Sequence, residues 1–223
     1  MKVFAFISVF LIVFCSCVGC GERSAVLSSS GMETLTVVID PGHGGVDGGV
    51  TGVNTGVKES ELNLEIAKGL KTCFESGGFK VVLTRETSAG LYGGLSKGFK
   101  MRDMQKRKEI VNGANADLMI SVHLNYYSSP ERRGAQVFFR QDDQRSQELA
   151  RYIQKQLNLT EREYSPLEGD YYVLNETNCL AVLCECGFLS NPEDERLLLT
   201  KEYRDKIAYR IYKGCILYLL EEA

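Results

Sequence analysis

The chain has 223 residues, of which 44% are hydrophobic and 25% are charged, and these proportions are typical of an ordinary globular domain. They exclude a disordered chain, a collagen-like repeat and a polytopic membrane protein. One domain of this length can bury a sizeable core, and little chain remains for a second. The formal net charge of −3 argues against a nucleic-acid partner, because binding phosphates needs a basic excess or a basic face.

The first twenty residues differ in composition from the rest of the chain. Lys2 precedes an uncharged, largely apolar run over residues 3–19, which is typical of a signal peptide or a short membrane anchor. We therefore expect residues 1–20 to be a leader or anchor, residues 21–34 to be a linker, and residues 35–223 to fold as one domain. Cys17 and Cys20 each follow a small residue, as a lipidated cysteine does, but their other neighbours suit that signal poorly.

The remaining cysteines do not indicate a disulfide framework. Beyond the leader their number is odd and they lie within apolar stretches, at Cys73, Cys179, Cys184, Cys186 and Cys215. A disulfide framework would normally use an even number. We expect free, buried thiols.

Strand and helix periodicities then alternate along the chain. Short apolar runs predict strands at residues 35–39, 79–83, 117–122, 135–139, 171–174 and 180–184. Apolar residues at helical spacing predict helices over residues 62–74, 101–115, 149–157 and 203–219, and Gly77 and Gly78 end the first of these. Such alternation indicates a single α/β domain, with a mixed, mostly parallel sheet that has helices on both faces.

The chain has only two histidines, and each comes at the end of a predicted strand. His43 lies just beyond the first strand. His123 directly follows the strand at 117–122, and Glu185 directly follows the strand at 180–184. The carboxyl ends of parallel strands open onto the ligand crevice of such sheets. We expect these three side chains to lie at one edge of the sheet.

Two histidines and a carboxylate are a typical ligand set for hydrolytic zinc. The spacing does not choose the carboxylate, which could be any of Asp40, Asp47, Glu59, Glu61 and Glu65. Glu59 stands where a long glycine-rich loop enters its helix, so it could fold back over the strand end or simply interact with the helix dipole. Asp40 and Asp47 could instead orient a ligand imidazole, or cap turns.

Four motifs in order resemble the zinc-dependent N-acetylmuramoyl-L-alanine amidases of bacterial cell walls. They are IDPGHGGVDGG, KESELNL, ADLMISVHLN and CECGFLSNPED, and the resemblance extends over about residues 37–220. Within that family, the TRET and RGAQVFF stretches and the short apolar N-terminus are similar to the germination-specific amidases of the spore cortex. The resemblance makes residues 35–223 a zinc amidase catalytic domain.

The resemblance also implies roles for individual residues. It implies that one Zn²⁺ is bound by His43, Glu59 and His123, and that Glu185 is the catalytic carboxylate. The substrate would be peptidoglycan, cleaved between N-acetylmuramic acid and L-alanine outside the cytoplasmic membrane. Membrane attachment through the N-terminal segment and an accessory protein are further expectations.

Basic residues suggest where an anionic substrate group could bind. Arg132 and Arg133 follow His123 on the strand-end side and suit stem-peptide carboxylates, and Asn125 is grouped with them as a substrate contact. The basic run at Lys97, Lys100, Arg102, Lys106, Arg107 and Lys108 is expected to be a solvated helix face instead.

Two other functions remain open at this point. A zinc peptidase could cut within the stem peptide with the same three ligands, and a non-catalytic wall-binding protein could keep the fold. Cys184 and Cys186 flank Glu185, but side chains alternate along a strand. Their thiols should therefore face away from Glu185 and pack as small apolar groups.

Overall fold

The computed structural model describes residues 34–222. The predicted leader, Cys17, Cys20 and nearly all of the predicted linker lie outside this part of the chain. None of the helices in residues 34–222 has the length and apolar character needed to span a membrane.

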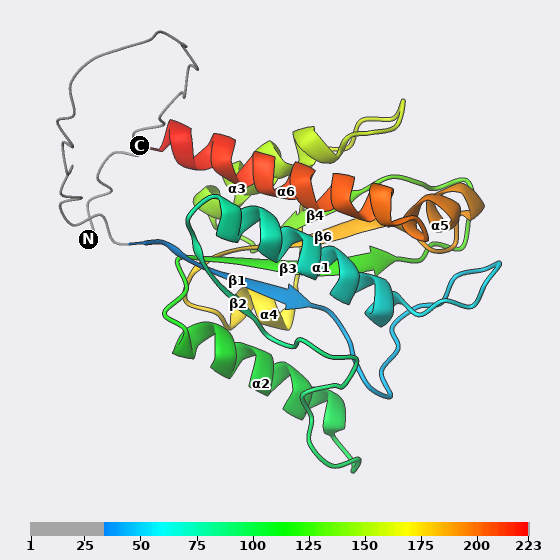
Figure 1. Ribbon diagram of the computed structural model, residues 1–223, viewed down its shortest axis with the longest axis horizontal. Helices are drawn as coiled ribbons and strands as arrows, with labels where there is room; N and C mark the ends of the chain where they lie inside the picture. The colour runs from blue at the N-terminus through cyan, green and yellow to red at the C-terminus, as the bar shows by residue number, and fades with distance from the viewer. Residues whose placement is uncertain (1–33, 223) are drawn as a thin grey trace, which may run out of the picture.

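A six-stranded sheet forms the centre of the molecule (Figure 1), with the strand order β2-β1-β3-β6-β4-β5. Four neighbouring strands of the sheet, β2, β1, β3 and β6, are parallel to one another. β4 runs antiparallel to β6, and β5 runs parallel to β4. The predicted mixed, mostly parallel sheet is therefore confirmed. The strands span Thr36–Pro41 (β1), Lys80–Leu83 (β2), Leu118–Asn125 (β3), Gln136–Phe139 (β4), Leu167–Glu168 (β5) and Leu180–Phe188 (β6).

Helices cover both faces of the sheet, as the periodicity predicts (Figure 1). One face is covered by α1 (Glu59–Ser76), α3 (Gln144–Leu157) and α6 (Lys201–Glu221). The other is covered by α2 (Phe99–Gly113) and the single turn α4 (Tyr172–Asn175). A short helix, α5 (Pro192–Leu198), lies beyond the end of β6.

The alternation of side chains along each strand divides the core in two. Val37 and Ile39 of β1 pack into the larger cluster beneath α1, α3 and α6, whereas Val38 packs into the smaller cluster with α2 and α4. All six residues of β1 are buried, because a central strand with helices on both sides has no solvent-facing side. This burial fixes the position of the loop that follows β1.

The strand predicted at residues 171–174 is wrong, because these residues enter the helical turn α4. The aromatic and β-branched residues there suit a strand, but that preference depends on context. In this position one helical turn buries Val173 and Leu174 against the smaller core cluster.

Two predicted strand ends are too early. β3 continues to Asn125 and β6 to Phe188, so His123 and Glu185 lie within their strands and not after them. The two residues are Cα partners across the parallel β3–β6 pair, so their strands hold them side by side.

Candidate metal centre

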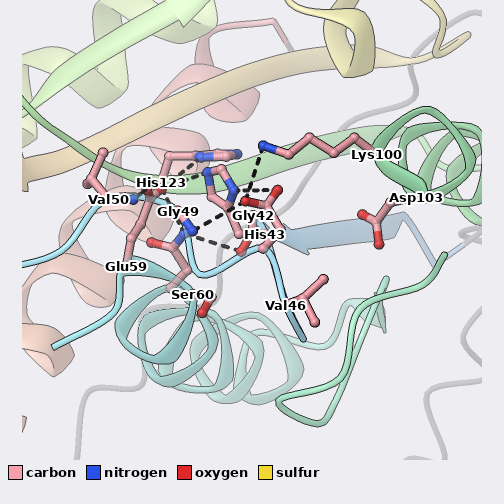
Figure 2. Close-up of polar contacts among 12 residues, drawn as sticks. Gly42, His43, Val46, Gly49, Val50, Glu59, Ser60, Lys100, Asp103 and His123 are labelled. Atoms are coloured by element: carbon pink, nitrogen blue, oxygen red, sulfur yellow. Dashed lines mark hydrogen bonds and ion pairs between the residues drawn. The ribbon is translucent and has the colours of Figure 1, made fainter. Parts of the chain in front are cut away.

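Three side chains from three elements converge beyond the carboxyl end of β1 (Figure 2). They are His43 in the loop after β1, Glu59 at the first position of α1 and His123 of β3. One ligand atom of each lies within 4.8 Å of the others. His43 Nε2 lies 3.3 Å from Glu59 Oε1, and His123 Nδ1 lies 3.0 Å from the same oxygen. Of the five carboxylates that spacing left open, Glu59 is the one whose oxygen lies close to both imidazoles.

Buried donors hold the Glu59 carboxylate in place. It is only 2% exposed, its Oε2 accepts the backbone N–H of Val50, and its Oε1 accepts the N–H of Leu124 and an amide N–H of Asn63. Burial would raise the pKa of Glu59, but hydrogen bonds to His123 and His43 lower it below its usual range. The carboxylate is therefore ionised and ready to bind a cation.

Two glycines leave the room that this cluster needs. A Cβ atom at Gly42 would lie 2.2 Å from the His123 ring, and one at Gly49 would lie 2.3 Å from Glu59 Oε2. Gly49 also has a φ of +69°, a conformation that favours glycine. The glycine-rich loop is thus shaped around the imidazole and the carboxylate.

The second nitrogen of His43 has its own partner. His43 Nδ1 lies 3.0 Å from Asp47 Oδ2, and Lys100 approaches Asp47 Oδ1 at 3.6 Å (Figure 2). Burial alone would lower the pKa of His43, but hydrogen bonding to Glu59 and Asp47 raises it. A carboxylate on the far nitrogen of a metal-binding histidine fixes the orientation of its ring. Asp47 is therefore placed to orient His43, one of the two roles open to it.

Asp40 has a different position. Its carboxylate accepts hydrogen bonds from Thr84, Ser121 and Arg107, and it contacts neither imidazole by a hydrogen bond. Burial would raise the pKa of Asp40, but Arg107 lowers it. Asp40 is part of the support beneath the loop.

Arg107 corrects the prediction that the whole basic run is solvated. It is fully buried and pairs with Asp40 and Asp103, each at 2.6 Å. Arg107 also donates to the backbone carbonyls of Pro41 and His43. The other basic residues of the run are exposed or half-buried, and the Lys100 side chain is 69% exposed.

A second buried arginine completes this support. Arg85 donates to the carbonyls of Pro41, Gly42 and Ser60. The two guanidinium groups thus bind three successive carbonyls, those of residues 41–43, and His43 has a φ of +60°, uncommon for a residue with a side chain. The sequence pattern does not indicate this role, because neither arginine is near His43 in the sequence.

Glu185 extends from β6 next to His123 but outside the group of three. It is 8% exposed, and its Oε2 is buried without a hydrogen-bond partner in the described part of the chain. Burial raises the pKa of Glu185 to about 7, although the His123 charge acts in the opposite direction. A carboxyl group with such a pKa can both accept and donate a proton near neutral pH.

Tyr171 is a further residue of this region that the sequence did not indicate. Its ring contacts Phe138 edge to face, and burial, together with the charge of Glu185, raises its pKa to about 12. Its hydroxyl is therefore neutral at working pH. Because residues 171–174 are predicted to be a strand, the sequence does not place Tyr171 near Glu185.

The remaining candidates lie at the end of β3, which is Asn125, and on the connection that follows it, which carries Arg132 and Arg133. Asn125 is half-buried and accepts the N–H of Tyr126 through its side chain. Arg133 Nε lies 3.5 Å from Asp194 Oδ1. Arg132 contacts aromatic rings and no carboxylate within the described residues.

The thiols that flank Glu185 lie on the other side of β6. Cys184 and Cys186 are buried in the larger core cluster, and burial raises the pKa of each well above its usual value. Every cysteine that the structure describes is free. The predicted orientation of the two thiols is confirmed.

Comparison with known proteins gives one family. Residues 37–216 match the family model described as N-acetylmuramoyl-L-alanine amidase. The germination-specific N-acetylmuramoyl-L-alanine amidase of Bacillus subtilis is 37% identical over 193 residues, which cover 83% of this chain and 80% of that protein. The N-acetylmuramoyl-L-alanine amidase LytC of the same organism is 32% identical, over 82% of this chain and 35% of that longer protein.

A solved structure agrees with these sequence matches. The CwlD amidase from Clostridioides difficile, in complex with the GerS lipoprotein, is 37% identical with a TM-score of 0.78. The superposition covers 83% of this chain and 98% of that one. On the family match, the identities and the shared fold, this chain belongs to the N-acetylmuramoyl-L-alanine amidase family.

Proposed function

We propose that this chain hydrolyses the amide bond between N-acetylmuramic acid and L-alanine in peptidoglycan, with Zn²⁺ bound by His43, Glu59 and His123. The observation that carries the proposal is the convergence of these three ligand atoms within 4.8 Å, with Glu185 on the neighbouring strand. Two imidazoles and one carboxylate are the ligands of several hydrolytic zinc enzymes. The family to which the chain belongs supports the choice of bond.

The donor set fits zinc in its chemistry and in the space around it. Glu59 is ionised and buried, and Gly42 and Gly49 keep side chains out of the space beside His123 and Glu59. When bound, zinc supplies a Lewis acid that makes water more acidic and polarises a carbonyl group. Asp47 orients His43 from the opposite side of its ring.

Glu185 has the proton-transfer role in this proposal. Its carboxylate accepts a proton from the attacking water and returns it to the departing nitrogen of L-alanine. The buried, unpartnered Oε2 and the pKa of about 7 support both steps. The hydroxyl or thiol nucleophile of a covalent mechanism is not needed.

We propose the spore cortex as the wall that is cleaved, because one similar relative is named a germination-specific amidase. The complex of another similar protein with a lipoprotein supports an accessory protein as partner. The apolar segment at residues 1–20 supports export, with the site outside the cytoplasmic membrane. Release of peptides from purified cortex, compared with vegetative wall, tests the choice of wall.

Variants of the two kinds of residue separate metal binding from proton transfer. Purified protein should contain about one zinc, and His43→Ala and His123→Ala should each lose most of it. Glu185→Gln should retain zinc and the fold but lose turnover by at least about 10²-fold. Metal analysis and release of new amino groups from peptidoglycan measure the two effects. Full zinc in the double histidine variant, or near-normal turnover of Glu185→Gln, would contradict the proposal.

A further inference from the structure

Arg132 is a cation held between aromatic rings without an acidic partner. Its guanidinium carbon lies 5.0 Å from the ring centre of Tyr127, 5.5 Å from that of Phe188 and 5.8 Å from that of Tyr164. No carboxylate within residues 34–222 forms an ion pair with it, and its Nε is buried without a hydrogen-bond partner. Arg133, the next residue, has Asp194 instead.

The three rings come from separate parts of the fold, and each is held in place. Phe188 ends β6, the backbone N–H of Tyr127 donates to Ser190 Oγ, and the hydroxyl of Tyr164 donates to the carbonyl of Arg133. The attraction between a guanidinium and the faces of aromatic rings does not use the N–H groups as hydrogen-bond donors to an oxygen. Arg132 is thus held in one position with donors to spare.

This cation lies along the same sheet edge as the proposed active site. It contacts Phe188, three residues after Glu185 on β6, and a strand advances roughly 3.3 Å per residue. The backbones of Glu185 and Phe188 are therefore on the order of 10 Å apart, and the Arg132 guanidinium lies 5.5 Å from the Phe188 ring centre. An extended peptide spans about 3.3–3.6 Å per residue, so the second or third residue of a peptide bound at the scissile amide comes to a similar distance.

We propose that Arg132 binds a carboxylate of the stem peptide, at the second or third residue after the scissile bond. This inference rests on the proposed function, since it identifies the part of the peptidoglycan that the rim of the same site recognises. The planar N–H edge of arginine matches a carboxylate, and such charged hydrogen bonds are stronger than neutral ones. Arg133 and Asn125, which have partners of their own, are not needed for this contact.

Three synthetic muramyl tripeptides test the proposal. One has free carboxylates at its second and third residues, and the other two each have one of these carboxylates converted to an amide. Their dissociation constants are measured with zinc-loaded Glu185→Gln protein, and kcat/KM is measured with the active enzyme. We expect one of the two amides to lower affinity and kcat/KM by about tenfold or more, as for a lost charged hydrogen bond.

The matching variants identify the residue responsible. Arg132→Gln should weaken binding of the fully acidic peptide by the same factor and should abolish the discrimination between acid and amide. Arg132→Lys should restore part of it. Arg162→Gln is the control, because Arg162 is exposed and stacks on the same Tyr164 ring, and it should leave the discrimination unchanged.

Two results would overturn the inference. One is equal binding of all three peptides by the Glu185→Gln protein that retains Arg132. The other is discrimination between acid and amide that survives when Arg132 is replaced by glutamine. Discrimination in binding without any cleavage of the muramyl amide would instead contradict the proposed reaction while supporting the role of Arg132.

Discussion

At the scale of single residues, the site depends on glycine at position 42 as much as on the two imidazoles and the carboxylate. His123 packs against the backbone of Gly42 so closely that a methyl group would lie 2.2 Å from its ring. His43 reaches the same point only from a left-handed backbone conformation, with a φ of +60°. The arginine donors on the carbonyls of residues 41–43 hold that conformation.

Replacing Gly42 by alanine should therefore weaken metal binding without unfolding the protein. The new methyl group must displace the His123 imidazole, and we expect the affinity for zinc to fall by at least about tenfold, because changes to the groups that position a metal ligand typically cost about 10–100-fold in metal affinity. Gly113→Ala is the matched control, because a Cβ there meets nothing within 4 Å. Competition with a chelator measures both affinities, and equal affinities would refute this role of Gly42.

At the scale of elements, α5 anchors the long loop between β1 and α1. Glu195 of α5 is 1% exposed and accepts the backbone N–H groups of Asn54 and Thr55, together with the Thr55 hydroxyl and the Asn54 amide. This loop carries Gly49 and Val50 to the Glu59 carboxylate. A helix beyond β6 thus supports the loop that contacts Glu59, the proposed ligand on α1.

Glu195→Gln should lower the free energy of unfolding at pH 7 by about 1–3 kcal/mol, the cost of weakening a buried charged hydrogen-bond network. Burial would raise the pKa of Glu195, but hydrogen bonds from Thr55 and Asn54 lower it. The contribution of the carboxylate is therefore present above its unfolded pKa of about 4.3, and it is lost as pH falls below that value towards the lower folded pKa.

Denaturant unfolding at pH 7 and below pH 4 measures this prediction. The difference between the unsubstituted protein and Glu195→Gln should shrink at the lower pH. Glu193→Gln on the same helix is the control, because the Glu193 side chain is 42% exposed, against 1% for Glu195, and pairs with the exposed Arg196, and such surface pairs contribute little. A difference that is unchanged or larger in acid would show that the carboxylate charge is not what stabilises the loop.

At the scale of the whole molecule, the sequence predicts the sheet and the edge at which the site lies. Apolar runs such as residues 35–39 and 180–184 indicate central strands, and the two histidines after such runs indicate the edge. Spacing could not identify Glu59 as the carboxylate that meets the two imidazoles, since its position depends on how the loop at residues 44–58 folds back. The resemblance to the family supplied it before the geometry did.

Long-range contacts explain the predictions that were wrong. The spacing of basic residues on α2 predicts a solvated face, because it carries no information about Asp40 of β1, with which Arg107 forms a buried ion pair. Residues 171–174 have the composition of a strand, but in the fold they enter a helical turn that buries Val173 and Leu174 in the smaller core cluster. In both cases tertiary packing overrides a local pattern.

The chemical ends released from purified peptidoglycan show most directly which bond the protein cleaves. An amidase leaves muramic acid with a free lactyl carboxylate and frees the amino group of L-alanine, whereas a peptidase frees an amine further along the stem. Zinc-loaded protein is incubated with peptidoglycan, and the new amino termini are labelled and identified. The glycan is then digested with a separate enzyme, and the masses of its fragments are measured by mass spectrometry. We predict new N-terminal alanine in equal amount to muramic acid without peptide. New amino termini at other residues, with every muramic acid still substituted, would contradict the account.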